Sequence, residues 1–218
     1  MGKRNMRHKV LSVRDISPTT YVLRLERNGF EFKPGQCVNL GIPGTGVNRE
    51  YSTYSGAGSE FLEFLIKEVP GGTVSTKLRA ATPGTEVDLH GPYGSFVLDP
   101  ARIIDSQFVF IASGTGIAPF HSFVTSYPEL DCQIIHGIRQ VAERCDIEDF
   151  DSRRVVTCVS REPLEGKQGR VTDYLKEASL STESIYYLCG NQAMIYDVYD
   201  LLRQGGVSGD KIFTEAFF

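Results

Sequence analysis

A short glycine-containing segment near the middle of the chain has the residue types of a phosphate-binding turn. Gly114, Thr115 and Gly116 follow an apolar run, residues 108–112, and precede a segment at 117–120 that could open a helix. Glycine lets backbone N–H groups approach an anion closely, and a helix start adds partial positive charge. The order favours a strand, a turn and a helix at the carboxyl edge of a parallel sheet. A tight turn without a ligand would look the same, and the spacing is not the usual G-x-G-x-x-G.

A second group of candidate side chains lies at Arg49-Glu50-Tyr51-Ser52. A guanidinium can pair bidentately with a diphosphate, an aromatic ring can stack on a planar cofactor, and a hydroxyl can donate to a ring nitrogen. In an extended strand, Arg49 and Tyr51 would share a face while Ser52 points away. An ordinary surface strand is the simpler interpretation of these residues taken alone.

A third candidate begins at Gly71-Gly72 and continues through hydroxyl residues to Leu78. This pattern predicts a helix start that could make a second phosphate contact, and a capped helix without a ligand fits equally well. Further on, residues 91–96 (G-P-Y-G-S-F) predict a tight turn that closes the first domain.

The elements that must position these residues change in character near Asp99-Pro100. Before this point, Tyr21, Leu23 and Leu25 alternate with less apolar neighbours, and 61–67 and 86–90 are further strand candidates between Gly/Pro turns. Regularly spaced short strands of this kind predict an antiparallel barrel or sandwich.

After Asp99-Pro100, four apolar runs recur at 108–112, 134–138, 155–159 and 185–189, with helical segments between some of them. The clearest helix is expected at 193–204, with Asn191 as N-cap and Gly205-Gly206 as its stop. Alternating strands and helices predict a parallel sheet covered by helices. The chain is therefore expected to form an antiparallel β-barrel domain at 1–99 and a Rossmann-like parallel α/β domain at 100–218.

Composition excludes several function classes. The chain has 218 residues and a net charge of −4, which gives no support to nucleic-acid binding. No apolar run approaches the roughly 20 residues that span a bilayer, and the basic N-terminus lacks the apolar segment of a signal peptide. The five cysteines are scattered, which argues against a disulfide framework or a cysteine-ligated metal site. We therefore expect a cytoplasmic protein with reduced thiols and no membrane partner.

The motifs, taken in order, resemble the ferredoxin–NADP reductase family. R-E-Y-S at 49–52, G-T-V-S-T-K-L at 72–78, G-P-Y-G-S-F at 91–96 and G-T-G-I-A-P at 114–119 are followed by four shorter matches at 159–162, 169–171, 189–191 and 215–218. The resemblance covers nearly the whole chain. It is strongest to the short bacterial ferredoxin or flavodoxin NADP reductases, which lack an iron–sulfur domain.

The resemblance implies that the first domain binds FAD. Arg49 would pair with the diphosphate, Tyr51 would stack on the isoalloxazine, and Ser52 would hydrogen-bond near flavin N5. The remaining FAD contacts implied by the resemblance come from Thr53, Ile66, Lys67, Gly72, Thr73, Val74 and Ser75.

The resemblance also implies a nicotinamide site in the second domain. Gly114, Thr115 and Gly116 would meet the dinucleotide diphosphate. Cys189 would orient the nicotinamide, although a buried small hydrophobe is the commonest role of a free cysteine. Glu215 would hold or relay a proton near flavin N5. Phe217 would cover the flavin, with Phe218 as the alternative aromatic and plain packing as the simpler role.

Cofactor choice is expected to depend on the residues after the third apolar run of this domain. Ser160 and Arg161 offer a hydroxyl and a guanidinium, which suit the 2′-phosphate of NADP, whereas an NAD site usually presents an acidic residue. Arg170 and Arg139 could add further cations. Solvated surface arginines are the alternative.

The implied function is electron transfer between NADPH and a ferredoxin or flavodoxin, with Ser52, Cys189 and Glu215 as the catalytic group. A monomer is expected. Basic clusters at Lys67, Lys77 and Arg79, or at Lys3, Arg4, Arg7 and Lys9, are candidate docking patches. The alternatives are an oxygenase reductase component, a flavin or quinone reductase, a nucleotide-dependent transferase and a non-catalytic interaction module.

Overall fold

The computed structural model describes residues 6–163 and 167–217, and the chain forms two compact units. The first unit comprises Met1–Val97 together with His121–Ser126. The second comprises Leu98–Phe120 and Tyr127–Phe218.

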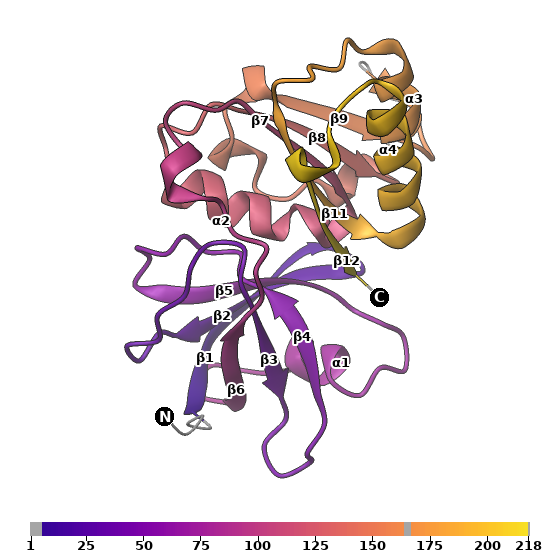
Figure 1. Ribbon diagram of the computed structural model, residues 1–218. Helices are drawn as coiled ribbons and strands as arrows, with labels where there is room; N and C mark the ends of the chain where they lie inside the picture. Colours follow the sequence, from indigo (N-terminus) through magenta and orange to yellow (C-terminus); the bar gives the residue numbers. More distant parts are fainter. Residues whose placement is uncertain (1–5, 164–166, 218) are drawn as a thin grey trace. The chain divides into compact units, whose positions relative to one another are not determined.

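The first unit is an antiparallel β sheet wrapped around one core, as the sequence predicts (Figure 1). Its strands follow the order β4-β3-β6-β1-β2-β5, and every pairing is antiparallel. Just beyond β4, the backbone N–H of Tyr54 donates to Glu63 O in β5 at 2.8 Å, which joins the two end strands. The elements are β1 (Met6–Ser17), β2 (Thr20–Glu26), β3 (Cys37–Gly41), β4 (Asn48–Ser52), β5 (Phe61–Lys67), α1 (Ser75–Arg79) and β6 (Glu86–Tyr93).

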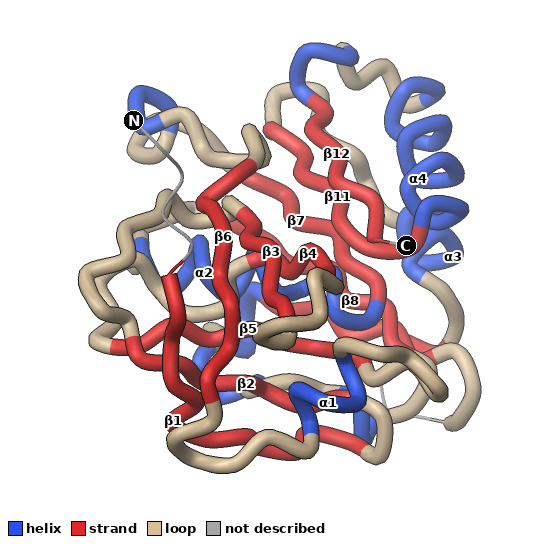
Figure 2. Tube along the Cα trace, turned by 90° about the horizontal axis from the view of Figure 1, so that it is seen from below, coloured by secondary structure: helices blue, strands red, loops and turns tan. Residues whose placement is uncertain are grey.

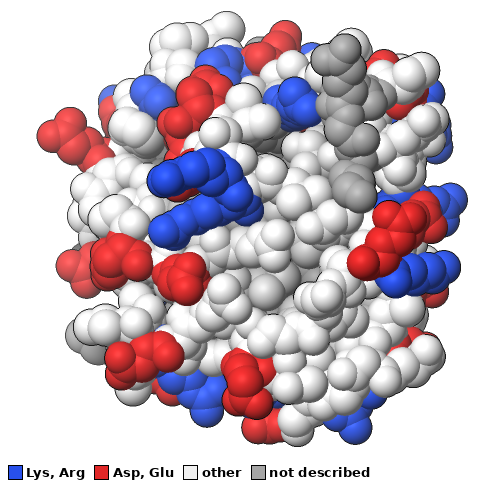
Figure 3. Space-filling model, turned by 90° about the horizontal axis from the view of Figure 1, so that it is seen from above, with Lys and Arg blue, Asp and Glu red and all other residues white. Residues whose placement is uncertain are grey.

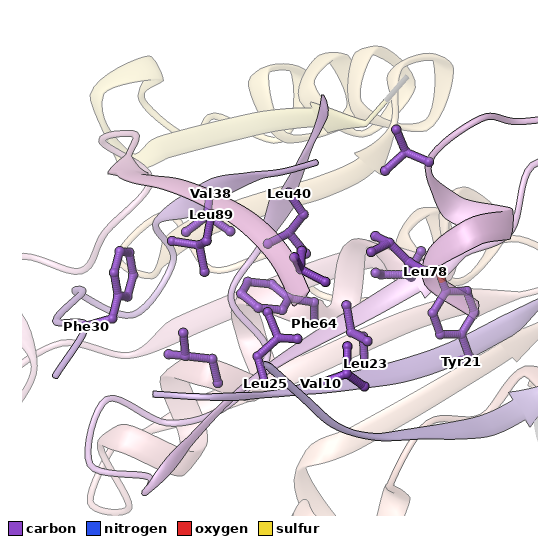
Figure 4. Packing of buried hydrophobic residues seen from close by; sticks show 14 of the residues in the cluster. Val10, Tyr21, Leu23, Leu25, Phe30, Val38, Leu40, Phe64, Leu78 and Leu89 are labelled. Carbon is purple, nitrogen blue, oxygen red and sulfur yellow. The ribbon is translucent and has the colours of Figure 1, made fainter. Parts of the chain in front are cut away.

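The core of this unit follows the predicted alternation along β2. Tyr21, Leu23 and Leu25 are fully buried in one cluster, whereas Arg24 and Glu26 are only partly covered. Val22, on the other face of the strand, is an exception to the predicted alternation because it is also buried. Figure 4 shows Tyr21 beside Leu78 of α1 at one end of this cluster and Phe30 at the other. Burial of alternate residues is therefore what fixes the register of β2 against its neighbours.

The tight turn expected at residues 91–96 is wrong, because β6 continues through Gly91 and Pro92 to Tyr93. The register between β3 and β6 shifts by one residue here, so Cys37 pairs with Tyr93 while Asn39 pairs with His90. Proline is tolerated within a sheet at such a bulge because no ladder hydrogen bond is required there. The Gly-Pro pair therefore bends the strand without ending it.

The second unit is a parallel sheet with helices on its faces (Figure 1), which confirms the predicted α/β architecture. Its strand order is β10-β9-β8-β7-β11-β12, and all pairings are parallel. Its elements are β7 (Phe108–Ser113), α2 (Ala118–Ser126), β8 (Cys132–Ile138), β9 (Val155–Val159), β10 (Lys167–Gln168), α3 (Val171–Glu177), β11 (Ile185–Asn191), α4 (Gln192–Gln204) and β12 (Ile212–Phe217).

Strand β7 is apolar on both sides because each face of the sheet is covered. Val109 and Ile111 belong to a buried cluster with residues of α3 and α4. Phe108 and Phe110 point the other way, and the Phe110 ring stacks on Phe120 of α2 with centroids 4.8 Å apart. A continuous apolar run, rather than alternation, is the pattern expected of such a strand.

Helix α4 begins and ends where the sequence predicts. The Asn191 side chain accepts hydrogen bonds from the backbone N–H groups of Ala193 (3.1 Å) and Met194 (3.4 Å), and Gly205 is the C-cap. Ile195, Val198 and Leu202 form its buried stripe. Helix α2 has a different arrangement, since its first turn belongs to the second unit and its later residues, 121–126, to the first.

Charged side chains of both signs are interspersed on the face drawn in Figure 3, around a central area without charge. This face therefore carries no large field of a single sign. Among the described residues, none of the helices has the length and apolar character needed to cross a membrane.

Candidate functional site

Strand β4 places the three side chains of the R-E-Y-S motif in different environments. Arg49 pairs with Leu40 across the β3–β4 ladder and Tyr51 with Val38. Arg49 is exposed, Tyr51 is half-buried and Ser52 is buried, so burial increases along the strand. Burial raises the pKa of Tyr51 to about 12, although nearby Arg49 opposes the shift. Tyr51 is therefore a neutral phenol that offers an apolar ring with a polar tip.

Arg49 is well suited to hold an anion. Its Nη1 donates to Asn48 O at 2.7 Å, and among the described residues no carboxylate pairs with its guanidinium. Exposed donors remain on the planar fork, which matches the oxygens of a diphosphate. The residue fits the FAD contact that the resemblance implies.

The segment after β5 folds into a closed loop. The Ser75 hydroxyl accepts from the backbone N–H of Val69 at 3.1 Å, and the N–H of Gly72 donates to Val69 O at 2.8 Å. Helix α1 begins at Ser75 with Val74 as N-cap. Val74 and Ser75 are buried, whereas Thr73 is exposed. The Gly72 N–H and the Ser75 hydroxyl therefore close the loop, and Thr73 is exposed on it.

Tyr21 connects this loop to the two strands that carry the other FAD candidates. Its hydroxyl donates to Ser75 O at 2.6 Å, and its backbone pairs with Ile66 of β5. Burial raises the pKa of Tyr21, and the neighbouring Tyr51 adds to the increase. Tyr21 thus lies close to β4, β5 and the loop, so the structure brings three separate sequence segments together.

Three further FAD candidates differ in exposure. Lys67 is exposed and pairs with Thr20 at the end of β5, and Ile66 is fully buried. Thr53 is also fully buried, and both its backbone N–H and its hydroxyl donate to Gln36 O at 3.0 Å. The Thr53 hydroxyl is therefore committed to holding the chain, which suits a supporting role.

In the second unit, the glycine turn lies where the strand order reverses. The chain proceeds from β7 to β8 on one side, and β11 pairs with β7 on the other. Ligands of open α/β sheets bind at the carboxyl ends of strands at such a switch point. Residues Gly114–Ile117 form a single 3-10 turn that leads directly into α2.

Glycine is required at positions 114 and 116 of this turn for two different structural reasons. Gly114 has φ of +55°, a left-handed conformation that favours glycine. A Cβ on Gly116 would lie 2.3 Å from Cys189 O, so only glycine allows the turn to pack against the end of β11. The Ser113 hydroxyl strengthens this junction by accepting from Asn191 N at 2.9 Å. Contact with β11 therefore explains why glycine is required at position 116.

His136 holds the turn from the opposite side, and sequence reasoning missed it. Its Nε2 lies 2.8 Å from Gly114 O, and because a carbonyl only accepts, Nε2 carries the proton. The side chain is buried, which lowers its pKa to about 4 despite the hydrogen bond to Gly114. His136 is therefore neutral at pH 7. The only sequence signal was a histidine near the end of an apolar strand.

Two predicted catalytic residues, Cys189 and Glu215, are neighbours across the β11–β12 ladder. Figure 2 shows these strands side by side. Cys189 is fully buried, and burial followed by the charge of Glu215 raises its thiol pKa well above the ordinary value. A protonated, buried thiol suits orientation rather than nucleophilic attack. Ser52, the third predicted catalytic residue, lies in the first unit.

The C-terminal aromatic residues are placed only in part. Phe217 ends β12, pairs with Asn191 and is half-buried. Phe218 lies outside the described residues. The choice between the two aromatics therefore stays a prediction.

Arg139 and Arg161 are held next to each other at the carboxyl ends of β8 and β9. The backbone N–H of Arg161 donates to Arg139 O at 2.9 Å. The N–H and the hydroxyl of Ser160 both donate to Ile138 O, at 3.1 and 3.2 Å. Both arginines are exposed.

Two carboxylates close to these arginines in the chain accept hydrogen bonds from the backbone. Glu143 accepts from Arg139 N at 2.9 Å, and Glu162 accepts from Val141 N. Across residues 6–163 and 167–217, neither the Arg139 nor the Arg161 guanidinium is in an ion pair. Arg170 is exposed at the start of α3, where its N–H donates to Asp173 Oδ2 at 2.8 Å. Within the part of the chain that the structure describes, the edge therefore offers two exposed guanidiniums, Arg139 and Arg161, that are in no ion pair.

Two protein-family models match the chain. The "Oxidoreductase FAD-binding domain" model covers residues 7–98, and the "Oxidoreductase NAD-binding domain" model covers residues 110–200.

Curated relatives are components of oxygenase systems. The propane 2-monooxygenase reductase component of Mycolicibacterium goodii is 32% identical over 98% of this chain and 68% of that protein. The toluate 1,2-dioxygenase electron transfer component of Pseudomonas putida is 31% identical over 95% of this chain and 66% of that protein. The chain thus spans about two thirds of the length of these relatives.

Solved structures share the architecture. The cytochrome P450 reductase GcoB of Amycolatopsis has a TM-score of 0.88 and 27% identity, over all of this chain and 71% of that one. A ferredoxin NADP+ reductase from Neisseria gonorrhoeae has a TM-score of 0.87 over the full length of both chains. Its identity is 24%, so this likeness concerns the fold alone.

Proposed function

The chain belongs to the ferredoxin–NADP reductase family, with an FAD-binding and an NAD-binding domain, and we propose that it carries electrons from NADPH to a ferredoxin or flavodoxin. Bound FAD and nicotinamide would supply the redox chemistry, which combines hydride transfer with one-electron transfer. The side chains of this chain bind, orient and supply protons.

In the first unit, Arg49 and the loop at 71–75 would bind the FAD diphosphate. The half-buried ring of Tyr51 would stack on the isoalloxazine. Ser52 would donate to a flavin nitrogen. Tyr21 would keep strand and loop in register through its bond to Ser75 O.

In the second unit, the turn at 114–116 would receive the dinucleotide diphosphate, with His136 fixing the Gly114 carbonyl. Cys189, protonated and buried, would shape the wall beside the nicotinamide. The Glu215 carboxylate, its neighbour on β12, would hold or pass on a proton.

The observation that carries the preference for NADPH is the pair Arg139 and Arg161. Their backbones are joined at 2.9 Å, and the adjacent carboxylates are occupied by backbone N–H groups. Two exposed guanidiniums that form no ion pair with any other described residue suit the 2′-phosphate, whereas an NAD site would place an acid near the ribose.

The test is the visible spectrum of the purified protein, followed by anaerobic titration with NADPH and separately with NADH. The proposal predicts flavin absorption bands that bleach at much lower NADPH than NADH. If both nucleotides bleach the flavin at the same concentration, the reductase assignment stands and the proposed 2′-phosphate site is wrong. A colourless protein that binds no added FAD would contradict the proposal.

The comparisons favour a second candidate, a reductase component of an oxygenase, because the curated relatives are such components. The acceptor distinguishes the two functions. Faster NADPH-dependent reduction of an oxygenase component than of free ferredoxin or flavodoxin would favour this candidate.

In each of the two basic clusters proposed for docking, some residues are in ion pairs or lie outside the described residues. Arg79 is paired with Asp15 and Glu68, and Arg7 with Glu86. Lys3 and Arg4 lie outside the described residues. Lys67 and Lys77 remain exposed and are the better candidates for an acidic carrier. The proposed setting is the cytoplasm, since five scattered free cysteines suit a reducing compartment.

A further inference from the structure

Arg79, the last residue of α1, joins three segments of the first unit. Its Nη1 donates to Glu68 Oε2 at 2.6 Å and to Pro18 O at 2.7 Å. Its Nη2 donates to Asp15 Oδ1 at 2.8 Å. One guanidinium therefore fastens α1 to the β1–β2 hairpin and to the residue that follows β5.

The pair between Arg79 and Glu68 is better shielded than an ordinary surface ion pair, whereas Asp15 is 67% exposed. The Arg79 side chain is 20% exposed and Glu68 is 25% exposed, so solvent screens the pair only in part. The fork engages two carboxylates and a carbonyl at short distances, and charge-assisted bonds of this kind fix geometry as well as adding energy. The guanidinium also lies 5.7 Å from the Tyr21 ring centroid.

The segment between the two anchor points is the proposed diphosphate loop. Glu68, held by Arg79, immediately precedes Val69, whose N–H is bound by the Ser75 hydroxyl at 3.1 Å. At the other end, Ser75 O accepts from Tyr21, and Arg79 itself closes the helix that Ser75 begins. Arg79 therefore holds both ends of residues 69–75. It bonds to Glu68, which immediately precedes this segment, and it is the last residue of the short helix that begins at Ser75.

We propose that Arg79 is a positioning residue for FAD, which holds the loop at 69–75 in the geometry that receives the diphosphate. This inference rests on the proposed function, since it assumes that the loop contacts FAD. Arg79 acts through the loop and needs no contact with the cofactor. Its own charge is already met by Asp15 and Glu68.

The test compares the affinities of the full-length apoprotein for FAD and for riboflavin, which lacks the phosphates. Arg79→Met should weaken FAD binding by about tenfold to a hundredfold, the scale of a lost charge-assisted hydrogen bond. Riboflavin affinity should stay within about twofold of wild type, because the ring site on β4 is untouched. Arg79→Lys keeps the charge without the fork and should restore only part of the loss.

The matched control is Arg24→Met in the same sheet. Arg24 also pairs with a carboxylate, Glu63, at 2.8 Å, but it has no contact with the loop. This variant should retain the preference for FAD over riboflavin. If Arg79→Met fails to fold, Glu68→Gln weakens the same anchor with Arg79 in place and should lower FAD affinity selectively.

The outcomes separate this inference from the proposed function. If the wild-type protein binds riboflavin as tightly as FAD, the proposed diphosphate site itself is wrong. A wild-type preference for FAD that survives in Arg79→Met and in Glu68→Gln would overturn the positioning role. Equal losses for FAD and riboflavin would also overturn it, because they would show general damage to the unit.

Discussion

The imidazole of His136 serves as a neutral donor inside the sheet, and that role makes stability depend on pH. Its pKa is lowered to about 4 because burial disfavours the charged form. The unfolded chain, with an ordinary histidine pKa near 6.5, therefore binds more protons than the folded chain between pH 6.5 and 4. The contribution of His136 to stability is complete above pH 6.5 and is lost as the pH falls.

We expect the free energy of unfolding to fall by about 3 kcal/mol from this group as the pH decreases from 6.5 to 4. His136→Gln keeps an N–H that can donate to Gly114 O and has no titration in this range. The measurement is denaturant unfolding of both proteins at a series of pH values. The two stability profiles should diverge below pH 6.5, and parallel profiles would show that His136 does not cause the slope.

A second prediction at the scale of one residue concerns Arg161. Arg161→Ala should cost about 1.5–3 kcal/mol of NADPH binding, because a charge-assisted hydrogen bond to the 2′-phosphate is lost. NADH binding should be nearly unchanged. Arg153→Ala is the matched control, since Arg153 precedes β9, the strand that Arg161 follows, and is paired with Asp151. Equal losses for NADPH and NADH in Arg161→Ala would refute the assignment.

At the scale of elements, the junction between the glycine turn and β11 determines whether the nucleotide edge can form. Gly116→Ala would place a methyl group 2.3 Å from Cys189 O, so the turn and the end of β11 must separate. Overpacking of this kind typically costs about 1–3 kcal/mol. We expect lower thermal stability and weaker binding of both NADPH and NADH.

Gly58 provides the control for that experiment. It is exposed, its φ lies outside the left-handed region, and an added Cβ would meet nothing within 4 Å. Gly58→Ala should leave stability and dinucleotide binding close to wild type. If Gly116→Ala behaves like Gly58→Ala in both measurements, close packing at β11 is not the reason for the glycine.

The elements that the sequence predicted are those with a local pattern. Residues 108–112 and 155–159 were found as strands because an apolar run needs no knowledge of its partners. The turn at 91–96 was wrong because Gly-Pro usually ends a strand, and the bulge that accommodates it depends on β3. Register between distant strands is a long-range property, so a local pattern does not contain it.

At the scale of the whole molecule, residues that position the site from a distance are also missed by a local sequence pattern. Arg49 and Gly114 could be proposed from their chemistry and motif alone. Tyr21, Arg79 and His136 could not, because each resembles ordinary strand or surface sequence. Tyr21 and His136 act on segments 54 and 22 positions away, and Arg79 joins its neighbour Glu68 to Asp15, 64 positions away. Residues 121–126 gave no signal of packing in the first unit.

That packing is specific and polar. His121 stacks on Tyr54 with ring centroids 3.9 Å apart, and its Nδ1 lies 2.7 Å from Tyr54 O. Ser122 donates to Ser55 O at 2.7 Å, and Ser126 accepts from Ala57 N at 2.8 Å. The first unit therefore takes in a piece of chain that follows the glycine turn.

The consequence concerns how this architecture can be recombined. A chimera built by joining residues 1–99 to the nucleotide half of another reductase would import foreign side chains at positions 121–126. Tyr54, Ser55 and Ala57 would then lose their present contacts with His121, Ser122 and Ser126. A chimera that exchanges cofactor specificity and stays functional must retain His121, Ser122 and Ser126. Its junctions with the foreign sequence should therefore lie before and after residues 121–126, the second part of α2.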